Sequence, residues 1–395
     1  MNLLVNVYNP EDYRFFKRFY PEFTKRGWEV SYLANGLLPF ILLKLEGETA
    51  YLARKVSDEF SVNFSNNFSV LTGRLTESEA GKNYSSIINK LEYIYAEAPW
   101  DIAIIPSGRL VNHVAISDFC DNKSIRKIFV GYGNIPNRTF VDPEGTDMAS
   151  FLYKKPEVLD KWAELDSFEE WRQDYIREKL QSHSIGQARS VNFKLKLKKN
   201  IQILSCYFER LFGIVGENSY YFGRGQKVEA VDLNFSDNLP DKYVFFPMQV
   251  STDAQIILNY DGNSIQGALD IMVARSRERG IPLVVKPHPA EIDADVMHYL
   301  NEVAGQGNIV LRNDNTFELI QGADEVWTIN STVGLESKIV GTPVTFEGNS
   351  IYREMEGPRI AAYVMKYLAK IEYFSDDEIT AEQFDDFFDE SRYQI

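Results

Sequence analysis

The sequence predicts an α/β protein with two domains, each built on a parallel sheet that helices cover. The chain has 395 residues, which exceeds the usual size of a single domain. Hydrophobic residues make up 44% of it and aromatic residues 13%, enough to fill separate cores. In both halves, short apolar runs alternate with segments of helical character. This alternation is typical of Rossmann-like domains, whose ligands bind at the C-terminal ends of the strands.

Composition excludes several classes of protein. A net charge of −15 argues against sequence-independent binding of nucleic acid, which needs a basic surface. The only cysteines, Cys120 and Cys206, give neither a disulfide framework nor a cysteine zinc site. The N-terminus lacks a signal-peptide pattern, and no apolar run approaches the ~20 residues that span a bilayer. We therefore expect a cytoplasmic protein that is at most peripheral to a membrane.

The first predicted domain covers residues 1–155. It opens with a βαβ unit, in which the strand "MNLLVNVYN" precedes a helix that ends at Gly27 and a second strand, "WEVSYLA". Further along this half, "WDIAIIPSG" and "IRKIFVGYG" are predicted strands on either side of the helix "LVNHVAISDFCDN". This order places the first sheet in the N-terminal part of the chain.

Residues 156–240 are predicted to form a helical insertion or linker, because long charged and aromatic stretches replace the alternation. Within it, residues 193–212, "FKLKLKKNIQILSCYFERLF", are basic and apolar in an otherwise acidic chain. Such a segment suits contact with anionic lipid or a lipid-linked acceptor. More often, such a run is a solvated strand or helix face on which lysine stems cover apolar surface. Both interpretations stay open at this point.

Residues 241–395 form the second predicted domain, in which the alternation is more regular. The acidic tail "FSDDEITAEQFDDFFDE" at its end is expected to be a helix or a frayed end without a function. Helical segments follow five predicted strands: "KYVFFPMQV", "IPLVVKPHP", "NIVLRN", "EVWTIN" and "TPVTFEG".

Charged and polar residues follow one of these strands directly. Lys286, His288 and Pro289 stand at the C-terminal end of "IPLVVKPHP", where an α/β fold binds its ligand. A lysine supplies a point charge for a phosphate, and a histidine donates a hydrogen bond to a phosphate oxygen or acts as an acid. The alternative is a rigid turn in which Pro287 and Pro289 fix the backbone and His288 serves a local carbonyl.

A second strand end points to the same chemistry. "EVWTIN" ends at Asn330, and a helix begins at once with Ser331 and Thr332, so that backbone N–H groups and two hydroxyls meet at a helix N-terminus, which favours anions. Glu336 falls one turn further along, where a carboxylate suits ribose hydroxyls. The alternative is an ordinary helix cap. Together with Lys286, these residues predict a phosphate-binding site on successive βα loops.

The chain resembles the capsule polysaccharide biosynthesis proteins, which include bacterial β-Kdo glycosyltransferases that use CMP-Kdo. The resemblance extends from about residue 100 to 352. It implies a GT-B-like fold, two Rossmann-like domains facing a central cleft, and a glycosyltransferase of capsule or lipopolysaccharide synthesis at the inner face of the inner membrane. The motifs that carry it are "IPSGRLVNHVA", "GNIPNRTFVDPEGTDMAS", "FFPMQVSTDAQI", "VVKPHPAE" and "INSTVGLESKIVGTPVTFEGNSIY".

The resemblance also implies roles for individual residues. Lys286 and His288 would hold the CMP phosphate together with Ser331 and Thr332, and Glu336 would lie near the cytidine ribose. Asp253 would be the nucleophile of a retaining transfer, with Gln249 beside it, because retention needs a carboxylate on the face opposite the leaving phosphate. Asp253 equally suits a cap for the helix that follows. The implied partners are a nucleotide sugar and a glycan or glycolipid acceptor.

One departure from the family pattern concerns the acid/base residue. Relatives carry a carboxylate just before a glycine after the fourth strand, whereas this chain has Gly131, Tyr132 and Gly133. The nearest acids are Asp142 and Glu144, for which a Pro-Glu-Gly turn with solvated acids is the favoured alternative. The candidate residues on the acceptor and acid/base side are therefore Ser107, Arg109, Asn134, Asp142 and Glu144.

Two further function classes remain, and no metal or other cofactor is expected. The chain could be a non-catalytic nucleotide- or carbohydrate-binding component of polysaccharide assembly, or an enzyme resembling UDP-sugar epimerases. No Asp-x-Asp pair of the kind that holds a divalent ion stands at a strand end. The "DAD" of residues 293–295 falls at a helix start and is interpreted as a capping cluster.

Overall fold

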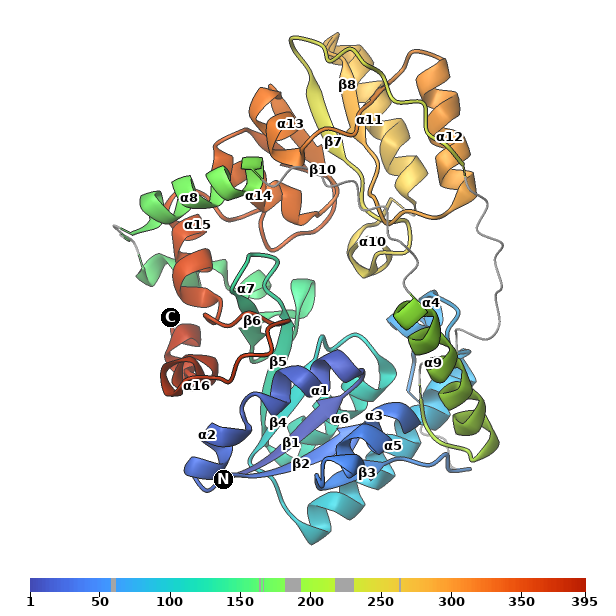
Figure 1. The fold of residues 1–395 in the computed structure, drawn as a ribbon, viewed down its shortest axis with the longest axis vertical. Coiled ribbons are helices and arrows are strands. Elements are labelled where there is room, and N and C mark those ends of the chain that lie inside the picture. The colour runs from blue at the N-terminus through green and yellow to red at the C-terminus, as the bar shows by residue number, and fades with distance from the viewer. Residues whose placement is uncertain (58–61, 163–164, 166, 182–192, 217–230, 263) are drawn as a thin grey trace. The chain divides into compact units, whose positions relative to one another are not determined.

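The computed structural model consists of two compact units, each with its own sheet (Figure 1). One unit contains Met1–Val158, helix α9 (Phe193–Leu211) and Lys366–Ile395, and the other contains helix α8 (Phe168–Gln181) and the chain from the second sheet to Met365. The structure describes the whole chain except residues 58–61, 163–164, 166, 182–192, 217–230 and 263, and the side chains of 193–200 and 202.

The first unit contains a six-stranded sheet in the order β3-β2-β1-β4-β5-β6. All neighbours pair in parallel except β5 and β6. The direction of the strand order reverses between β1 and β4, and the C-terminal ends of these strands mark the expected ligand position. The strands are β1 (Asn2–Val7), β2 (Glu29–Ala34), β3 (Ala50–Leu52), β4 (Ile102–Pro106), β5 (Arg126–Tyr132) and β6 (Thr139–Asp142).

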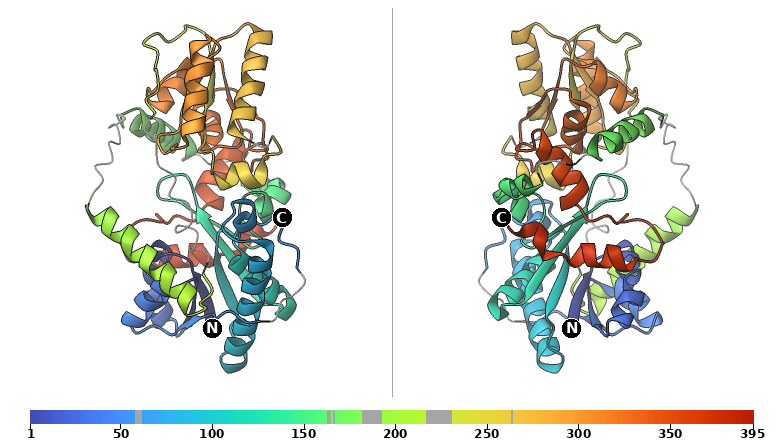
Figure 2. Two further views of the ribbon diagram at one scale, coloured as in Figure 1. Left: turned by 90° about the vertical axis from the view of Figure 1, so that its right-hand side faces the viewer. Right: turned by 90° about the vertical axis from the view of Figure 1, so that its left-hand side faces the viewer.

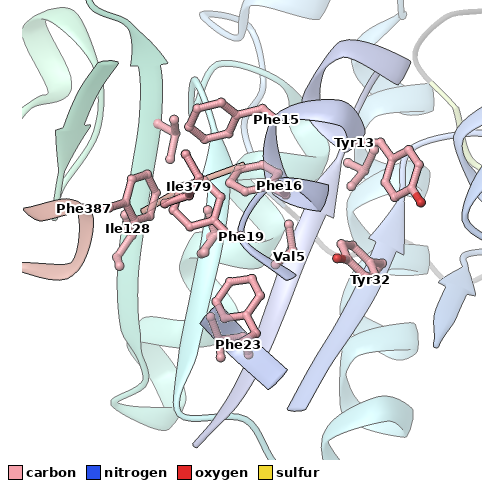
Figure 3. Close-up of a cluster of buried hydrophobic side chains, with 14 of the residues drawn as sticks. Val5, Tyr13, Phe15, Phe16, Phe19, Phe23, Tyr32, Ile128, Ile379 and Phe387 are labelled. Carbon is pink, nitrogen blue, oxygen red and sulfur yellow. The ribbon is translucent and has the colours of Figure 1, made fainter. Parts of the chain in front are cut away.

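Helices cover both faces of this sheet. The phenylalanines of α1 and α2 pack on one face together with Phe387 of α16, while α5 and α6 pack on the other (Figure 3). Helix α9 contacts α3 and is the yellow-green helix in Figure 2. The helices are α1 (Pro10–Lys17), α2 (Tyr20–Lys25), α3 (Leu37–Leu45), α4 (Phe68–Leu71), α5 (Glu77–Glu97), α6 (Val111–Lys123), α7 (Phe151–Lys154) and α16 (Ala381–Phe388).

The second unit contains a five-stranded parallel sheet in the order β11-β10-β7-β8-β9. Its order reverses between β7 and β10. The strands are β7 (Val244–Pro247), β8 (Leu283–Lys286), β9 (Val310–Leu311), β10 (Glu325–Thr328) and β11 (Val344–Phe346). The helices, of which α11 and α12 lie side by side (Figures 1 and 2), are α10 (Ala254–Asn259), α11 (Ile265–Arg279), α12 (Ala294–Gly305), α13 (Thr316–Gly322), α14 (Thr332–Val340) and α15 (Pro358–Ala362).

These two units confirm the predicted class of two Rossmann-like domains, but their boundaries differ from the predicted ones. The predicted insertion, 156–240, is divided, because α8 belongs to the second unit and α9 to the first. The tail after Met365 returns to the first unit. Its helix α16 inserts Phe384 and Phe387 among the phenylalanines of α1 and α2, so the acidic tail is part of a core and not a frayed end. Burial of aromatic side chains explains this placement.

Within the described part of the chain, none of the helices combines the length and the apolar character that crossing a bilayer requires.

Candidate functional site

The loops after β7 and β10 are joined where the order of the second sheet reverses. Gln249 follows β7 and Asn330 follows β10, and both are buried. The Gln249 side-chain amide donates to Asn330 Oδ1 at 3.0 Å, and the Asn330 backbone N–H donates to Gln249 Oε1 at 3.3 Å. The Asn330 amide also donates to the carbonyl of Gln255 at 2.8 Å. Gln249 and Asn330 therefore act as a frame that positions the loops.

Lys286 lies at the C-terminal end of β8, as the sequence predicts. Its ammonium donates to the Asp314 carbonyl at 2.7 Å and to Thr316 Oγ1 at 2.9 Å. Burial lowers the pKa of Lys286, and the Asp314 and Glu336 carboxylates oppose this shift. An ammonium has three N–H groups, so two anchored bonds leave one for a ligand. These two hydrogen bonds hold the Lys286 ammonium at the strand end, so the side chain loses less conformational entropy when a ligand binds.

His288 presents one ring nitrogen to its own loop and leaves the other available. Its Nδ1 accepts a hydrogen bond from the backbone N–H of Ala290 at 3.1 Å. An acceptor Nδ1 in a neutral imidazole places the proton on Nε2, which is then a donor. Partial burial of the ring lowers the pKa of His288, while the Asp253 and Glu291 carboxylates raise it. The turn interpretation is therefore correct for Nδ1, and Nε2 remains suited to a phosphate oxygen.

Ser331 caps helix α14. Its Oγ accepts from the backbone N–H of Val333 at 3.2 Å, and Thr332 is the first helical residue. Both side chains are half-buried, so the start of the helix is accessible in part. Gly334 serves packing: a Cβ there would lie 2.3 Å from the ring of Phe346. The glycine therefore makes room for an aromatic side chain, and the cap leaves the Ser331 and Thr332 hydroxyl hydrogens available.

Glu336 is buried and has partners that the sequence did not suggest. Its Oε1 accepts from the Tyr175 hydroxyl at 3.1 Å and from the Lys179 ammonium at 3.2 Å, both on helix α8. Burial and the Glu336 carboxylate raise the pKa of Tyr175, so the phenol keeps its proton and donates. One carboxylate oxygen is thus committed to α8, and Oε2 is the one suited to a ribose hydroxyl. Distance along the chain hid both partners from sequence analysis.

Asp253 caps helix α10, with its Oδ1 accepting from the Gln255 backbone N–H at 2.9 Å. The capping interpretation is therefore correct for one oxygen. The same carboxylate lies near enough to His288 to raise its pKa. The structure thus brings Asp253 and His288 into one electrostatic neighbourhood in the second unit.

Glu291 was not singled out in the sequence, yet it ties the loops after β7 and β8 together. It is buried, and it accepts from the Ser251 backbone N–H at 2.7 Å and from the Ser251 hydroxyl at 3.2 Å. It also accepts from the backbone N–H groups of Ile292 and Asp293, each at 2.9 Å. The position directly after "KPHPA" was the available signal. Glu291 therefore helps to place Asp253 relative to His288.

Three of the residues expected on the acceptor side follow strands of the first unit. Ser107 follows β4 with a positive φ of 55°, and its Oγ lies 3.4 Å from His113 Nδ1. Arg109 forms an ion pair with Asp147. Asn134, after β5, also has a positive φ, 57°. Positive φ at non-glycine residues marks loops held by their surroundings.

Asp142 and Glu144 form a structural turn. Asp142 is buried, and its Oδ1 accepts from the backbone N–H groups of Glu144, Gly145 and Phe151 at 2.8, 3.1 and 2.9 Å. Its Oδ2 accepts from the Tyr367 hydroxyl at 2.9 Å. A carboxylate with so many donors has no free position for a substrate proton. Glu144 is exposed and pairs with a lysine, so the solvated-turn interpretation is correct for Glu144, whereas Asp142 is buried and not solvated.

Among the described residues, no group of three or more His, Cys, Asp or Glu side chains is arranged to hold a metal ion.

Comparison with known proteins gives one family and several distant structures. Residues 188–357 match the family described as capsule polysaccharide biosynthesis protein. Protein FixF of Sinorhizobium fredii is 34% identical over 121 residues, 29% of this chain and 28% of that protein, so the chain spans little more than a quarter of that relative's length.

The solved structures share little sequence with this chain. A Thermosulfurimonas dismutans KpsC β-Kdo 2,7 transferase structure has 14% identity and a TM-score of 0.47, with 98% of this chain and 99% of that chain covered. The β-Kdo 2,4 transferase structure of the same protein has 13% identity and a TM-score of 0.40, with 91% and 89% covered. A Methanocaldococcus jannaschii UDP-GlcNAc 2-epimerase has 10% identity and a TM-score of 0.31, with 87% and 83% covered.

Proposed function

Since residues 188–357 match the capsule polysaccharide biosynthesis family, we propose that this chain is a glycosyltransferase of bacterial capsule or lipopolysaccharide synthesis. Its donor is a CMP-sugar such as CMP-Kdo, and its acceptor is a glycan or glycolipid. The observation that carries the proposal is His288, whose Nδ1 accepts from its own loop, which places the ring proton on Nε2 as a donor toward a ligand. It stands beside Lys286, one strand from the point where the sheet order reverses.

The proposed phosphate site combines three kinds of donor. Lys286 supplies a charge, His288 supplies Nε2–H, and the start of helix α14 supplies the Ser331 and Thr332 hydroxyls with the positive end of the helix dipole. Charge-assisted hydrogen bonds of this kind contribute about 1.5–3 kcal/mol each. These donors stabilise the phosphate as it leaves, and the site has no need of a metal. EDTA treatment should therefore leave turnover intact, and loss of activity that manganese restores would contradict this.

The proposed chemistry is a double displacement with Asp253 as the nucleophile. The carboxylate attacks the anomeric carbon, the bond from that carbon to the phosphate oxygen breaks, and CMP leaves with the electron pair. An acceptor hydroxyl then attacks the same carbon and passes its proton to a water molecule, while the bond from that carbon to the carboxylate breaks and the carboxylate leaves with the electron pair. Two inversions restore the configuration. Oδ1 of Asp253 accepts a hydrogen bond from the Gln255 backbone N–H, so Oδ2 is the oxygen proposed to attack.

A non-catalytic nucleotide-binding role is the second candidate. What favours it is the Gly131–Gly133 segment, which lacks the carboxylate that relatives are expected to carry, together with the structural role of Asp142. Incubation with CMP-Kdo and calorimetry with CMP separate the candidates. A transferase binds CMP and also cleaves CMP-Kdo, by hydrolysis or transfer, to give free CMP. A binding component binds CMP but does not cleave CMP-Kdo. Failure to bind CMP would contradict both.

We also propose that helix α9 contacts a membrane surface. It exposes apolar side chains at helical spacing on one side, with Tyr207 and Leu211 59% and 63% exposed. The lysines of its first turns lie outside the described side chains, although their positions in the sequence give the helix its basic end. Aromatic and leucine side chains beside lysines suit anionic lipid. Flotation with vesicles containing phosphatidylglycerol should therefore capture the wild type but not a Leu204→Ser, Leu211→Ser double variant.

A further inference from the structure

The first unit has a small pocket at the C-terminal edge of its sheet, apart from the proposed nucleotide site. It lies beside the ends of β1 and β2, where the fold rule places a ligand. Its volume of about 20 Å3 accommodates one water molecule or one hydroxyl group. The residues that line it follow β1, begin α3 or come from α9: Tyr8, Asn9, Pro10, Leu38, Pro39, Ser205, Cys206 and Glu209.

Glu209 is the acidic residue of this pocket, and one of its oxygens receives no hydrogen bond from the part of the chain that the structure describes. The residue is only 3% exposed. Its Oε1 accepts from the Leu37 backbone N–H at 2.6 Å and from the Ser205 hydroxyl at 3.3 Å. Its Oε2 is buried without a hydrogen bond among the described residues. A buried polar atom without a partner is costly, so a donor from outside the chain would stabilise it.

The surrounding backbone makes room for this carboxyl group. A Cβ at Gly36, which has a φ of +117°, would lie 2.6 Å from Glu209 Oε1, and one at Gly216 would lie 2.7 Å from Oε2. Because these two glycines have no side chain, the Glu209 oxygens can lie close to the backbone at both positions. The chain after α9 is held as well, since the Val215 backbone N–H donates to the Ala53 carbonyl at 3.0 Å. The position of Glu209 is therefore built into the unit.

The pocket adjoins residues that the sequence places on the acceptor side. The ring of Tyr8, which lines the pocket, lies edge-on to His113 with 6.2 Å between ring centres. His113 in turn is 3.4 Å from the Ser107 hydroxyl. Ser107 follows β4, so the pocket and Ser107 lie on either side of the point where the order of the first sheet reverses.

The chemistry of the pocket selects its ligand. Most of the lining is apolar, including the Tyr8 ring, Pro10, Leu38 and Pro39, and the buried Oε2 that lacks a hydrogen bond from the described residues belongs to a carboxyl group. Sugars combine apolar C–H faces with hydroxyl groups in this way. We propose that Glu209 hydrogen-bonds a hydroxyl group of the acceptor glycan, which makes this pocket an acceptor subsite. This proposal rests on the proposed glycosyltransferase function for the identity of the glycan, but not for the binding itself.

Three variants separate this role from a structural one. Glu209→Gln keeps an oxygen that accepts from the Leu37 N–H and replaces Oε2 with an amide NH2 group. Gly216→Ala keeps the carboxyl group but displaces Oε2. Thr72→Ala removes a hydroxyl that donates to the Phe68 carbonyl at 2.7 Å outside the pocket lining, and it is the control. The probe is a mixture of methyl glycosides of common hexoses, and saturation-transfer NMR on the full chain measures the binding.

The expected result is saturation transfer to a glycoside in the wild type and Thr72→Ala, reduced at least fivefold in Glu209→Gln and Gly216→Ala. CMP affinity, measured on the same samples, should stay at the wild-type value. Equal transfer in all four proteins, or none in the wild type, would overturn the subsite. A failed CMP measurement with intact glycoside binding would instead overturn the proposed function alone.

Discussion

Gln249 and Asn330 hold each other by two hydrogen bonds, at 3.0 and 3.3 Å, across the pair of strands where the order of the second sheet reverses. We do not expect either side chain to bind the ligand directly, because their amide groups are hydrogen-bonded to each other and to the Gln255 carbonyl. They are positioning residues. The loops that carry Asp253 and Ser331 depend on them.

Gln249→Leu should therefore affect both stability and binding. The substitution leaves the Asn330 amide oxygen and backbone N–H buried without partners, a cost of about 1–3 kcal/mol. Thermal unfolding should show a lower midpoint, and calorimetry should show weaker CMP binding. Ser337, on helix α14, offers a control because its hydroxyl bonds only within its helix, so Ser337→Ala should lower neither quantity comparably. Unchanged CMP affinity in Gln249→Leu would contradict the positioning role.

His288 can be tested one nitrogen at a time. Asparagine reproduces the acceptor at Nδ1 and lacks the donor at Nε2, whereas glutamine reaches the Nε2 position with an N–H group. His288→Asn should weaken CMP binding by about 1.5–3 kcal/mol, the value of a charge-assisted bond. His288→Gln should retain more of the affinity. If calorimetry finds the reverse order, the turn contact of Nδ1 matters and the phosphate contact of Nε2 does not.

Glu336 offers a test of nucleoside recognition. Its Oε1 is bonded to Tyr175 and Lys179, so a ribose contact falls to Oε2. Glu336→Gln retains an acceptor for Tyr175 and loses the carboxylate. We expect the wild type to prefer CMP over 2′-deoxy-CMP and the variant to lose most of that preference. A wild type that binds both nucleotides equally would show that Glu336 serves only to dock helix α8.

His113 predicts a pH dependence of stability in the first unit. Burial lowers the pKa of His113 to about 3, and the Arg109 charge adds to this shift. Between the unfolded pKa of about 6.5 and that folded value, the unfolded chain binds a proton that the folded chain does not. The stability contributed by neutral His113 is therefore present above pH 6.5 and falls by up to about 1.4 kcal/mol per pH unit below it.

His113→Phe removes this titration. The free energy of unfolding of the wild type should fall relative to that of the variant as the pH drops from 7 to 4, because only the wild type loses the stability that neutral His113 contributes. Urea unfolding at several pH values measures it. A difference that stays constant over this range would show that the buried ring titrates normally.

The strand ends of the second unit were predictable, because a parallel sheet collects its loops at one edge and the local motifs are short. Lys286, His288 and Ser331 all lie where the sequence placed them. The uses of their individual atoms were not predictable. Capping by Asp253 and Ser331 was an open alternative that only coordinates could decide.

Long-range packing accounts for what the sequence concealed. Tyr175 and Lys179 lie more than 150 positions from Glu336, and nothing local shows that α8 and α9 join different units. Phe384 and Phe387 looked like part of an acidic tail, yet they complete the core around Phe19. Glu209 follows the same rule, since its partner Leu37 and the neighbouring Gly36, at the start of helix α3, lie more than 170 positions away. The periodicity of the sequence predicts helices and strands but not which of them pack against each other.

Comparing the release of CMP from CMP-Kdo by the wild type and by Asp253→Asn shows whether Asp253 is the nucleophile of a sugar transfer. The variant keeps an oxygen for the Gln255 N–H cap but loses the charge that a nucleophile needs, so it should bind CMP as the wild type does while turnover falls at least a hundredfold. We expect steady CMP release by the wild type and almost none by the variant. Absence of release by the wild type, or release by Asp253→Asn at the wild-type rate, would contradict it.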